Sequence, residues 1–212
     1  GINDAHDVEA VLEATRLGGQ VREKDIAGRT DFREVTTVTI DGEHARDFDD
    51  AITIDRLPNG NFWLGVHIAD VSHYVHEGSP LDEEARLRAT SVYFPERAVH
   101  MFPSELSTGL CSLNPHVDRL VQSCLMEVDP RGAVVRYEIH DGVIHSRARM
   151  TYTDVNGILT DRDPALVERY QPLVPMFEAM HELFRILNDA RRRRGSIDFD
   201  LNEAEGLADS GR

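Results

Sequence analysis

The chain has 212 residues and a formal net charge of −15, which is enough sequence for one large domain or two small ones. This charge argues against a general nucleic-acid-binding surface, because Lys and Arg dominate phosphate binding. It does not exclude a metal-dependent nuclease, whose acidic cluster counts against the total before the metal is bound. Cys111 and Cys124 form neither a disulfide scaffold nor a CxxC motif, and no signal peptide or long apolar run is present. We therefore expect a soluble, cytoplasmic, monomeric protein without membrane contact.

The first part of the chain is predicted to contain one helix, a connector and three strands. Val8, Val11 and Leu12 repeat at helical spacing, and Asn59-Gly60 is a strong hairpin signal. The expected elements are a helix over Asp4–Leu17, a polar connector over Gln20–Glu34, and strands over Thr36–Ile40, Ala51–Asp55 and Phe62–Ala69. We place a boundary after residue 34, between an N-terminal helix with its connector (1–34) and the main domain (35–212).

The second part combines a further hairpin with a long helical region. Ser79 as N-cap and Pro80 at the first position predict a helix to about Arg88. The other expected elements are an extended piece at Ser91–Phe94, a helical turn at Pro103–Gly109, a hairpin of Arg119–Val128 with Ala133–Ser146, helical turns at Thr153–Leu159, a helical region over Pro164–Arg194 interrupted near Pro172 and Pro175, and an extended piece at Ser196–Leu201. The apolar face of the helical region Pro164–Arg194 is expected to hold Phe177, Met180, Leu183, Phe184 and Leu187. Strands come early and the long helix comes late, which favours an α+β fold.

The most informative stretch is DGEHARDFDDA, residues 41–51, which lies between the strand-like runs Val35–Ile40 and Ala51–Ile54. Its five carboxylates within ten residues are those of Asp41, Glu43, Asp47, Asp49 and Asp50. Carboxylates held this close raise each other's pKa values. A hard cation such as Mg²⁺ removes that conflict, because it prefers carboxylate oxygen and water.

The spacing of these carboxylates leaves the metal site and a solvated acidic loop equally open. Asp41, Asp47 and Asp49 share odd parity, so an extended backbone would point them to one side, whereas Asp50 would need a bend. An EF-hand loop is excluded, because the required Gly and the Glu at the twelfth position are missing.

Three aromatic residues and one arginine run each allow two interpretations. Tyr93, Tyr152 and Phe199 lie in short extended pieces with polar neighbours, where they can either pack in a core or stack on nucleic-acid bases. Arg191–Arg194 closes the long helix, where it can either interact with the helix dipole or contact phosphate.

The sequence resembles the catalytic RNB domain of the ribonuclease II and ribonuclease R family of processive 3′→5′ exoribonucleases, and is closer to ribonuclease R. The resemblance rests on TIDGEHARDFDDAI (39–52), HIADVSHYVHEGSPLDEEARLRATSVYFP (67–95), MFPSELSTGLCSLNPHVDRL (101–120) and RARMTYTDVNGIL (147–159), with a looser match at RRRRGSIDF (191–199). It implies an α+β, RNB-type domain with twisted antiparallel β-sheets and packed helices, of which this chain is the N-terminal part.

The resemblance also implies roles for individual residues. Asp41, Asp47, Asp49 and Asp50 match the four active-site aspartates that hold Mg²⁺ at the scissile phosphate. Tyr93 matches a tyrosine that stacks on the RNA end, Tyr152 a tyrosine of the RNA cavity, and Phe199, less closely, a phenylalanine that clamps the bases. The family's further arginine and glutamate, its cold-shock-like domains and its S1 domain are expected outside residues 1–212.

The expected reaction is Mg²⁺-dependent hydrolysis of single-stranded RNA to nucleoside 5′-monophosphates. In this hypothesis Asp41 and Asp50 bind the principal Mg²⁺, and Asp47 and Asp49 complete the site or hold a second ion. Two other classes remain open: a non-catalytic RNA-binding or scaffold protein of the same fold, and a calcium-stabilised interaction domain. We expect the chain by itself to be inactive or weakly active.

Overall fold

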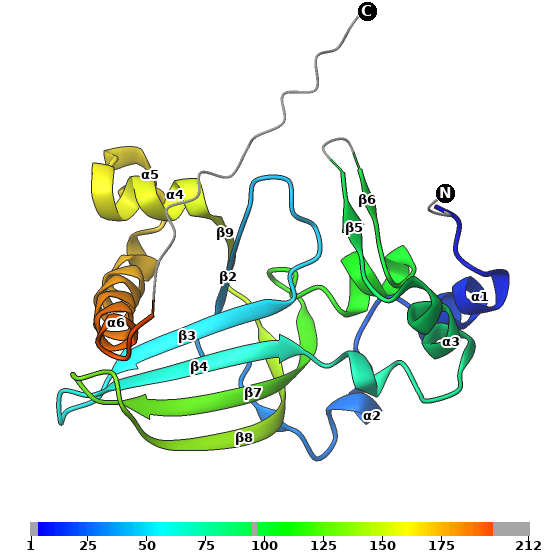
Figure 1. The fold of residues 1–212 in the computed structure, drawn as a ribbon, viewed down its shortest axis with the longest axis horizontal. Helices are drawn as coiled ribbons and strands as arrows, with labels where there is room; N and C mark the ends of the chain where they lie inside the picture. The colour runs from blue at the N-terminus through cyan, green and yellow to red at the C-terminus, as the bar shows by residue number, and fades with distance from the viewer. Residues whose placement is uncertain (1–3, 95–96, 197–212) are drawn as a thin grey trace, which may run out of the picture.

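The fold is described from a computed structural model, which describes residues 4–94 and 97–196. One seven-stranded sheet runs in the order β1-β8-β7-β4-β3-β2-β9, and β5 and β6 form a separate hairpin (Figure 1). The strands are β1 Thr30–Asp31, β2 Val38–Asp41, β3 Asp50–Arg56, β4 Phe62–Ala69, β5 Val92–Tyr93, β6 Ala98–Val99, β7 Asp118–Val128, β8 Val134–His145 and β9 Ala148–Thr151.

The helical elements come from both halves of the chain. They are α1 Val8–Leu17, α2 Glu23–Ile26, η1 Val71–His73, α3 Pro80–Arg88, η2 Glu105–Leu110, α4 Tyr152–Asn156, η3 Gly157–Asp161, α5 Pro164–Arg169, η4 Gln171–Leu173 and α6 Val174–Arg193. The α+β class is confirmed. The four inner strand pairs are antiparallel as expected, but the edge pairs β1–β8 and β2–β9 are parallel.

The two hairpins and the helix start predicted from turn and cap residues are confirmed. β3 and β4 join through a turn in which the Leu57 N–H donates to the Asn61 carbonyl at 2.8 Å. Gly60 has a φ of +87° there, a conformation that few other residues adopt readily. Helix α3 begins after Ser79, whose hydroxyl accepts a hydrogen bond from the Asp82 N–H. Local sequence rules therefore suffice where the structure is set by neighbouring residues.

Two predicted apolar faces are wrong in part. Helix α1 buries Ala10 and Ala14, while Val8 is exposed, because the close approach of α1 to α3 favours small side chains. In α6 the buried residues all lie between Met176 and Leu183, while Phe184 is exposed although it shares the predicted face. The predicted Gln20–Glu34 connector contains α2 and β1, so it adds an edge strand to the sheet. The boundary at residue 34 stays a prediction.

Two hydrophobic clusters lie at opposite ends of the sheet. One joins α1, α3 and η2 to the sheet through residues such as Leu81, Leu106 and Leu120. The other joins α6 and η3 to β2, β3 and β9 through residues such as Phe177 and Met150. In Figure 1 the β2–β3 connection stands between these two groups of helices. Within the described ranges, none of the helices has the length and apolarity needed to cross a membrane.

Candidate active site

The acidic stretch forms the connection from β2 to β3. Asp41 is the last residue of β2 and lies opposite Thr151 of β9, whereas Asp50 is the first residue of β3 and lies opposite Ile68 of β4. Residues 42–49 are a loop with a turn near Gly42, not an extended strand, so the parity argument does not apply to them. The loop stands between β9 and the β5–β6 hairpin (Figure 1). Of the four aspartates, Asp41 and Asp50 are thus fixed by strands, and Asp47 and Asp49 are carried by the loop.

The electrostatics of the loop show that its carboxylates interact. Burial and then the negative charge of Asp50 raise the pKa of Asp41 to about 6, with smaller contributions from Asp49 and Asp47. Desolvation and the charges of Asp47 and Asp50 also raise the pKa of Asp49, although its side chain still reaches solvent. Asp41 Oδ2 is buried without a hydrogen-bond partner among the described residues. The site therefore has excess negative charge and an unsatisfied carboxylate oxygen.

These features fit a hard divalent cation in chemistry but not yet in placement. Four aspartates supply the oxygen donors that Mg²⁺ prefers, and a cation would satisfy the buried oxygen of Asp41. In the described parts of the chain, however, no group of three or more His, Cys, Asp or Glu side chains is placed to hold a metal ion. Like charges repel, so bringing the carboxylates together requires either a counter-ion or protonation.

Tyr93 and His100 border the loop from the β5–β6 side. The Tyr93 hydroxyl donates a short hydrogen bond to Asp47 Oδ2, and His100 Nδ1 lies 3.7 Å from the same oxygen. Burial and this hydrogen bond raise the pKa of Tyr93 to about 12, so the phenol stays protonated at neutral pH. Its ring is 61% exposed, which leaves a face open to a ligand. Tyr93 and Asp47 together line two cavities of about 570 and 450 Å³.

Tyr152 borders the loop from the β9 side. It directly follows Thr151, the residue opposite Asp41, and its side chain is 66% exposed. The Thr151 hydroxyl accepts a hydrogen bond from the Asp154 N–H and so begins helix α4 next to the carboxylates. Tyr93 and Tyr152 therefore stand on opposite sides of the acidic loop. Phe199 lies outside the described residues.

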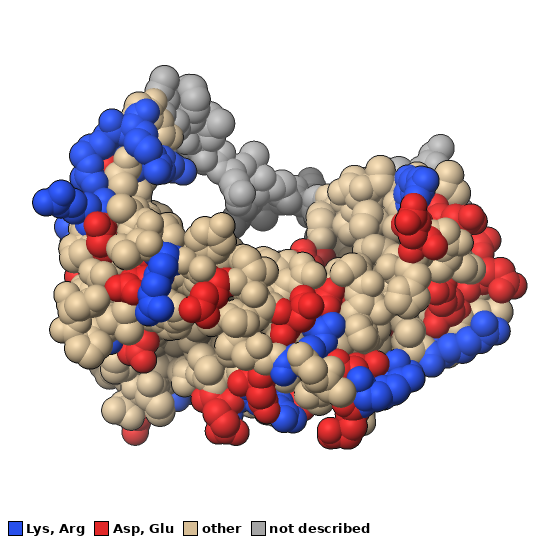
Figure 2. All heavy atoms as spheres, turned by 90° about the horizontal axis from the view of Figure 1, so that it is seen from below, with Lys and Arg blue, Asp and Glu red and all other residues tan. Residues whose placement is uncertain are grey.

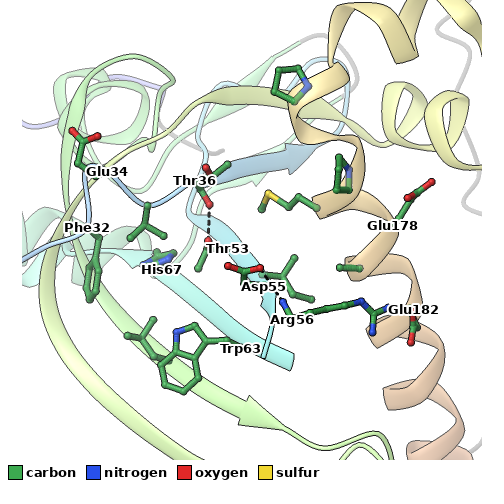
Figure 3. A pocket seen from close by; sticks show the side chains of 17 residues that line it. Phe32, Glu34, Thr36, Thr53, Asp55, Arg56, Trp63, His67, Glu178 and Glu182 are labelled. Atoms are coloured by element: carbon green, nitrogen blue, oxygen red, sulfur yellow. Dashed lines mark hydrogen bonds and ion pairs between the residues drawn. The ribbon is translucent and has the colours of Figure 1, made fainter. Parts of the chain in front are cut away.

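A cavity of about 910 Å³ lies apart from the acidic loop, between α6, β3, β4 and the segment before β2 (Figure 3). Its lining includes Thr53, Trp63, His67 and Glu182, but none of the four aspartates. His67 is fully buried, and its Nδ1 lies 2.7 Å from the Ser123 hydroxyl. Burial lowers the pKa of His67 to about 4, so its imidazole is neutral at physiological pH. Because the four aspartates lie elsewhere, we do not place the site in this cavity.

The raised pKa of Asp41 predicts a pH dependence of stability. Between about pH 4 and pH 6 the folded chain keeps a proton on Asp41 that the unfolded chain has released. The free energy of unfolding contributed by this group therefore falls as the pH rises through that window. The contribution of His67 to the free energy of unfolding rises with pH over the same window, because its pKa is lowered in the folded chain. The contribution of Asp41 is therefore isolated by the difference in the free energy of unfolding between the wild type and Asp41→Asn at each pH.

We expect urea unfolding without divalent cations to show Asp41→Asn gaining stability relative to the wild type as the pH rises from about 4 to 7. Mg²⁺ at neutral pH should raise the stability of the wild type more than that of the variant, because ligand binding stabilises only the state that binds. A stability difference that stays constant with pH would contradict the raised pKa of Asp41.

The sequence did not point to three residues that contact the loop from elsewhere in the chain. Ser112 lies within hydrogen-bonding distance of both Arg46 and Phe48, Arg149 donates to loop carbonyls, and His100 approaches Asp47. The one available signal was Phe48, a lone aromatic residue between two aspartates, because an apolar side chain inside an acidic loop is expected to be buried. It is 5% exposed.

The chain is similar to known proteins in sequence and in fold. The RNB domain family matches residues 29–210. Ribonuclease R 1 of Lactococcus lactis is 50% identical over 197 residues, which cover 93% of this chain and 24% of that protein. The ribose-methylated single-stranded RNA complex of Mycoplasma genitalium RNase R aligns with a TM-score of 0.78 at 32% identity, over 92% of this chain and 30% of that one. The same enzyme with double-stranded RNA gives a TM-score of 0.79 at 31% identity, over 92% and 34% of the two chains.

The chain spans about a quarter of the length of the curated relatives that it matches. The family match includes all four aspartates, both tyrosines and every described strand of the sheet. The chain therefore belongs to the RNB domain family, and residues 29–210 are its RNB region.

Proposed function

We propose that the protein containing this chain is a Mg²⁺-dependent, processive 3′→5′ exoribonuclease that hydrolyses single-stranded RNA to nucleoside 5′-monophosphates. The observation that carries the proposal is the placement of Asp41, Asp47, Asp49 and Asp50 along the β2–β3 connection and at its two ends, with raised pKa values at Asp41 and Asp49. The RNB domain match supports it, as do ribonuclease R relatives and an RNA complex of one of them.

In the proposed mechanism Asp41 and Asp50 hold the principal Mg²⁺, and Asp47 and Asp49 complete the site or hold a second ion. Bound Mg²⁺ would neutralise phosphate charge and activate water for attack on phosphorus. Asp49, whose side chain reaches solvent, would orient the attacking water. The Tyr93 hydroxyl holds Asp47 in place. The rings of Tyr93, Tyr152 and Phe199 stack on bases, which contributes about 1–3 kcal/mol per base and requires no particular sequence.

The chain alone offers little basic surface for a polynucleotide. Figure 2 shows Asp and Glu spread over the face that it presents, with one group of Lys and Arg at the upper left, where α6 lies, and a second at the lower right. The last turn of α6 contains Arg191, Arg192 and Arg193, and Arg193 donates to the carbonyl of Arg131 at 3.0 Å. Because the chain matches only a quarter of its relatives, we propose that most of the RNA-gripping surface lies outside it and that the isolated chain is inactive or weakly active. A monomer in the cytoplasm stays our prediction.

A non-catalytic RNA-binding or scaffold protein of the same fold is the second candidate. It is favoured by one observation: within residues 4–94 and 97–196, no set of three or more His, Cys, Asp or Glu side chains is placed to hold a metal ion. The two candidates differ in turnover, since a scaffold would bind RNA and release no nucleotide.

The discriminating experiment is hydrolysis of 5′-labelled single-stranded RNA by the natural full-length protein. With Mg²⁺ we expect the full-length RNA to be converted to a short 5′-labelled end product without accumulation of intermediates, and chromatography to detect the released nucleoside 5′-monophosphates; EDTA should stop both. A circular RNA of the same sequence is the matched control, because it has no 3′ end and should persist. RNA binding without turnover would favour the scaffold, and Ca²⁺ binding with neither RNA binding nor turnover would favour a calcium-stabilised domain.

A further inference from the structure

We propose that Arg149 and Ser112, which lie outside the acidic loop, are positioning residues that hold the backbone of this loop, and with it the attachment points of Asp47 and Asp49, before any ion binds. This inference rests on the proposed function of the same site. It concerns residues 42–49, because the strands already fix Asp41 and Asp50.

Arg149 anchors the first half of the loop. It projects from β9, the strand that pairs with β2. One of its terminal nitrogens, Nη2, donates to the carbonyls of Gly42 at 2.6 Å and Glu43 at 3.0 Å and lies 3.5 Å from that of Ala45. Its guanidinium carbon is also 5.4 Å from the centre of the Phe48 ring. The guanidinium combines these carbonyl contacts, made at the far end of a long side chain, with a planar group over the Phe48 ring, a combination that a Lys ammonium lacks.

Ser112 anchors the second half of the loop. It is fully buried, and its hydroxyl donates to the Arg46 carbonyl at 2.9 Å and accepts from the Phe48 N–H at 3.0 Å. The neighbouring Leu113 N–H donates to the Phe48 carbonyl at 2.8 Å. Both residues that flank Asp47 are therefore fixed by Ser112, and Asp49 directly follows the fixed carbonyl of Phe48. The hydroxyl reaches both backbone groups because it can donate and accept at the same time.

Ser112 is itself held in place by a residue of β7. Arg119, a 6% exposed residue of β7, donates from its Nε to the Ser112 carbonyl at 2.8 Å. The side chain of Phe48 is buried in the same cluster as Leu113 and Leu120. The loop is therefore attached to β9 on one side and to the start of β7 on the other. This arrangement fixes the backbone on both sides of Asp47 and directly before Asp49, so only the side chains have to move when a counter-ion draws the carboxylates together.

The role of Arg149 in holding the loop can be separated from its charge. Its positive charge also favours the ionised form of Asp41. Arg149→Lys keeps that charge, but its shorter side chain does not extend to the position of Nη2 and has no planar group to lie over the Phe48 ring, whereas Arg149→Met also removes the charge. Since a displacement of about 1 Å at a catalytic group can cost about 100-fold in rate, we expect both variants to lower kcat by about 10- to 100-fold. The KM for RNA should change by less than about threefold, because no RNA contact is removed.

The matched control is Arg147→Lys. Arg147 lies two positions earlier, is exposed, and donates to the Arg33 carbonyl at 3.1 Å, away from the loop. We expect wild-type kcat for it. Ser112→Ala should lower kcat as Arg149→Met does, because it removes the hydroxyl that holds Arg46 and Phe48. Ser112→Thr keeps a hydroxyl and should have a higher kcat than Ser112→Cys, whose thiol is only a weak donor and acceptor. A circular-dichroism melt of each variant identifies any that has simply lost its fold, and half-buried Arg149 is the residue whose replacement should be tolerated best.

A readout without RNA completes the test. Hydrogen–deuterium exchange of peptides covering residues 42–49 in the full-length protein should become faster in Arg149→Lys and Ser112→Ala, and stay unchanged in Arg147→Lys. Wild-type kcat in both Arg149 variants, or wild-type kcat in Arg149→Lys with loss only in Arg149→Met, would overturn the anchor role. If the wild type hydrolyses no RNA, the proposed function fails, while the exchange result still decides whether these residues hold the loop.

Discussion

Asp49→Asn is expected to lower kcat for RNA hydrolysis by at least about 100-fold while leaving RNA binding close to that of the wild type. The substitution keeps the size of the side chain and removes its negative charge. Asp49 reaches solvent at the loop and interacts electrostatically with Asp47 and Asp50. Its loss removes a carboxylate from the reacting centre and no contact from the hydrophobic core. Single-turnover hydrolysis and filter binding of the same labelled RNA, both with the full-length protein, measure the two quantities.

The control for this prediction is Glu43→Gln. Glu43 belongs to the same acidic loop and is exposed, but it is not among the four aspartates assigned to the metal. Removing its charge should change kcat by less than about threefold, as expected for an exposed charge in water. Equal losses from both substitutions would mean that the total negative charge of the loop matters and not the particular carboxylate. Wild-type hydrolysis by Asp49→Asn would remove Asp49 from the mechanism.

Phe177→Ala is expected to lower the free energy of unfolding by about 3–5 kcal/mol, because it removes a large side chain from a packed core. Phe177 is fully buried in the cluster that joins α6 to β2, β3 and β9. Urea unfolding, followed by circular dichroism, measures the change. A loss of this size is a large part of the total stability of a typical domain, so a lower temperature or a stabilising osmolyte is needed for the comparison.

The matched control is Phe184→Ala, on the same helix. The Phe184 side chain is 63% exposed, so its removal should cost less than about 1 kcal/mol. The helical spacing of the apolar residues predicted the same environment for both. Equal losses would show that Phe184 is also buried in the folded protein and that the boundary of the core at Leu183 is wrong.

Much of the fold could be predicted where neighbouring residues determine the structure. The Asn59-Gly60 turn and the Ser79 cap were correct because turn and cap preferences act over a few residues. The strand β1 and the parallel pairing of β2 with β9 were missed. Both depend on partners about 110 residues away in the chain, which neither periodicity nor turn chemistry reports. The exposed positions of α1 and α6 were missed for a related reason, because spacing predicts a face but not what covers it.

The candidate site shows a similar division. Spacing alone gave DGEHARDFDDA even odds of binding metal, and the four aspartates were assigned through family resemblance. The structure adds how the site is held together. Asp41 ends β2, Asp50 begins β3, and Ser112 and Arg149 fix the loop that joins these two strands. Neither anchor could be recognised in the sequence, because a single Ser or Arg far from the loop has no local pattern. Tyr93 was assigned a stacking role, and its hydrogen bond to Asp47 became visible only in three dimensions.

The central claim is that the loop between β2 and β3 is a divalent-cation site. Its most direct test is Mn²⁺ binding to the full-length protein, followed by electron paramagnetic resonance in the absence of RNA. The wild type should bind Mn²⁺, and Mg²⁺ should displace it. The double variant Asp41→Asn, Asp50→Asn should lose this binding, while Glu43→Gln should retain it. Binding of equal strength in the double variant, or no displaceable Mn²⁺ in the wild type, would contradict the claim.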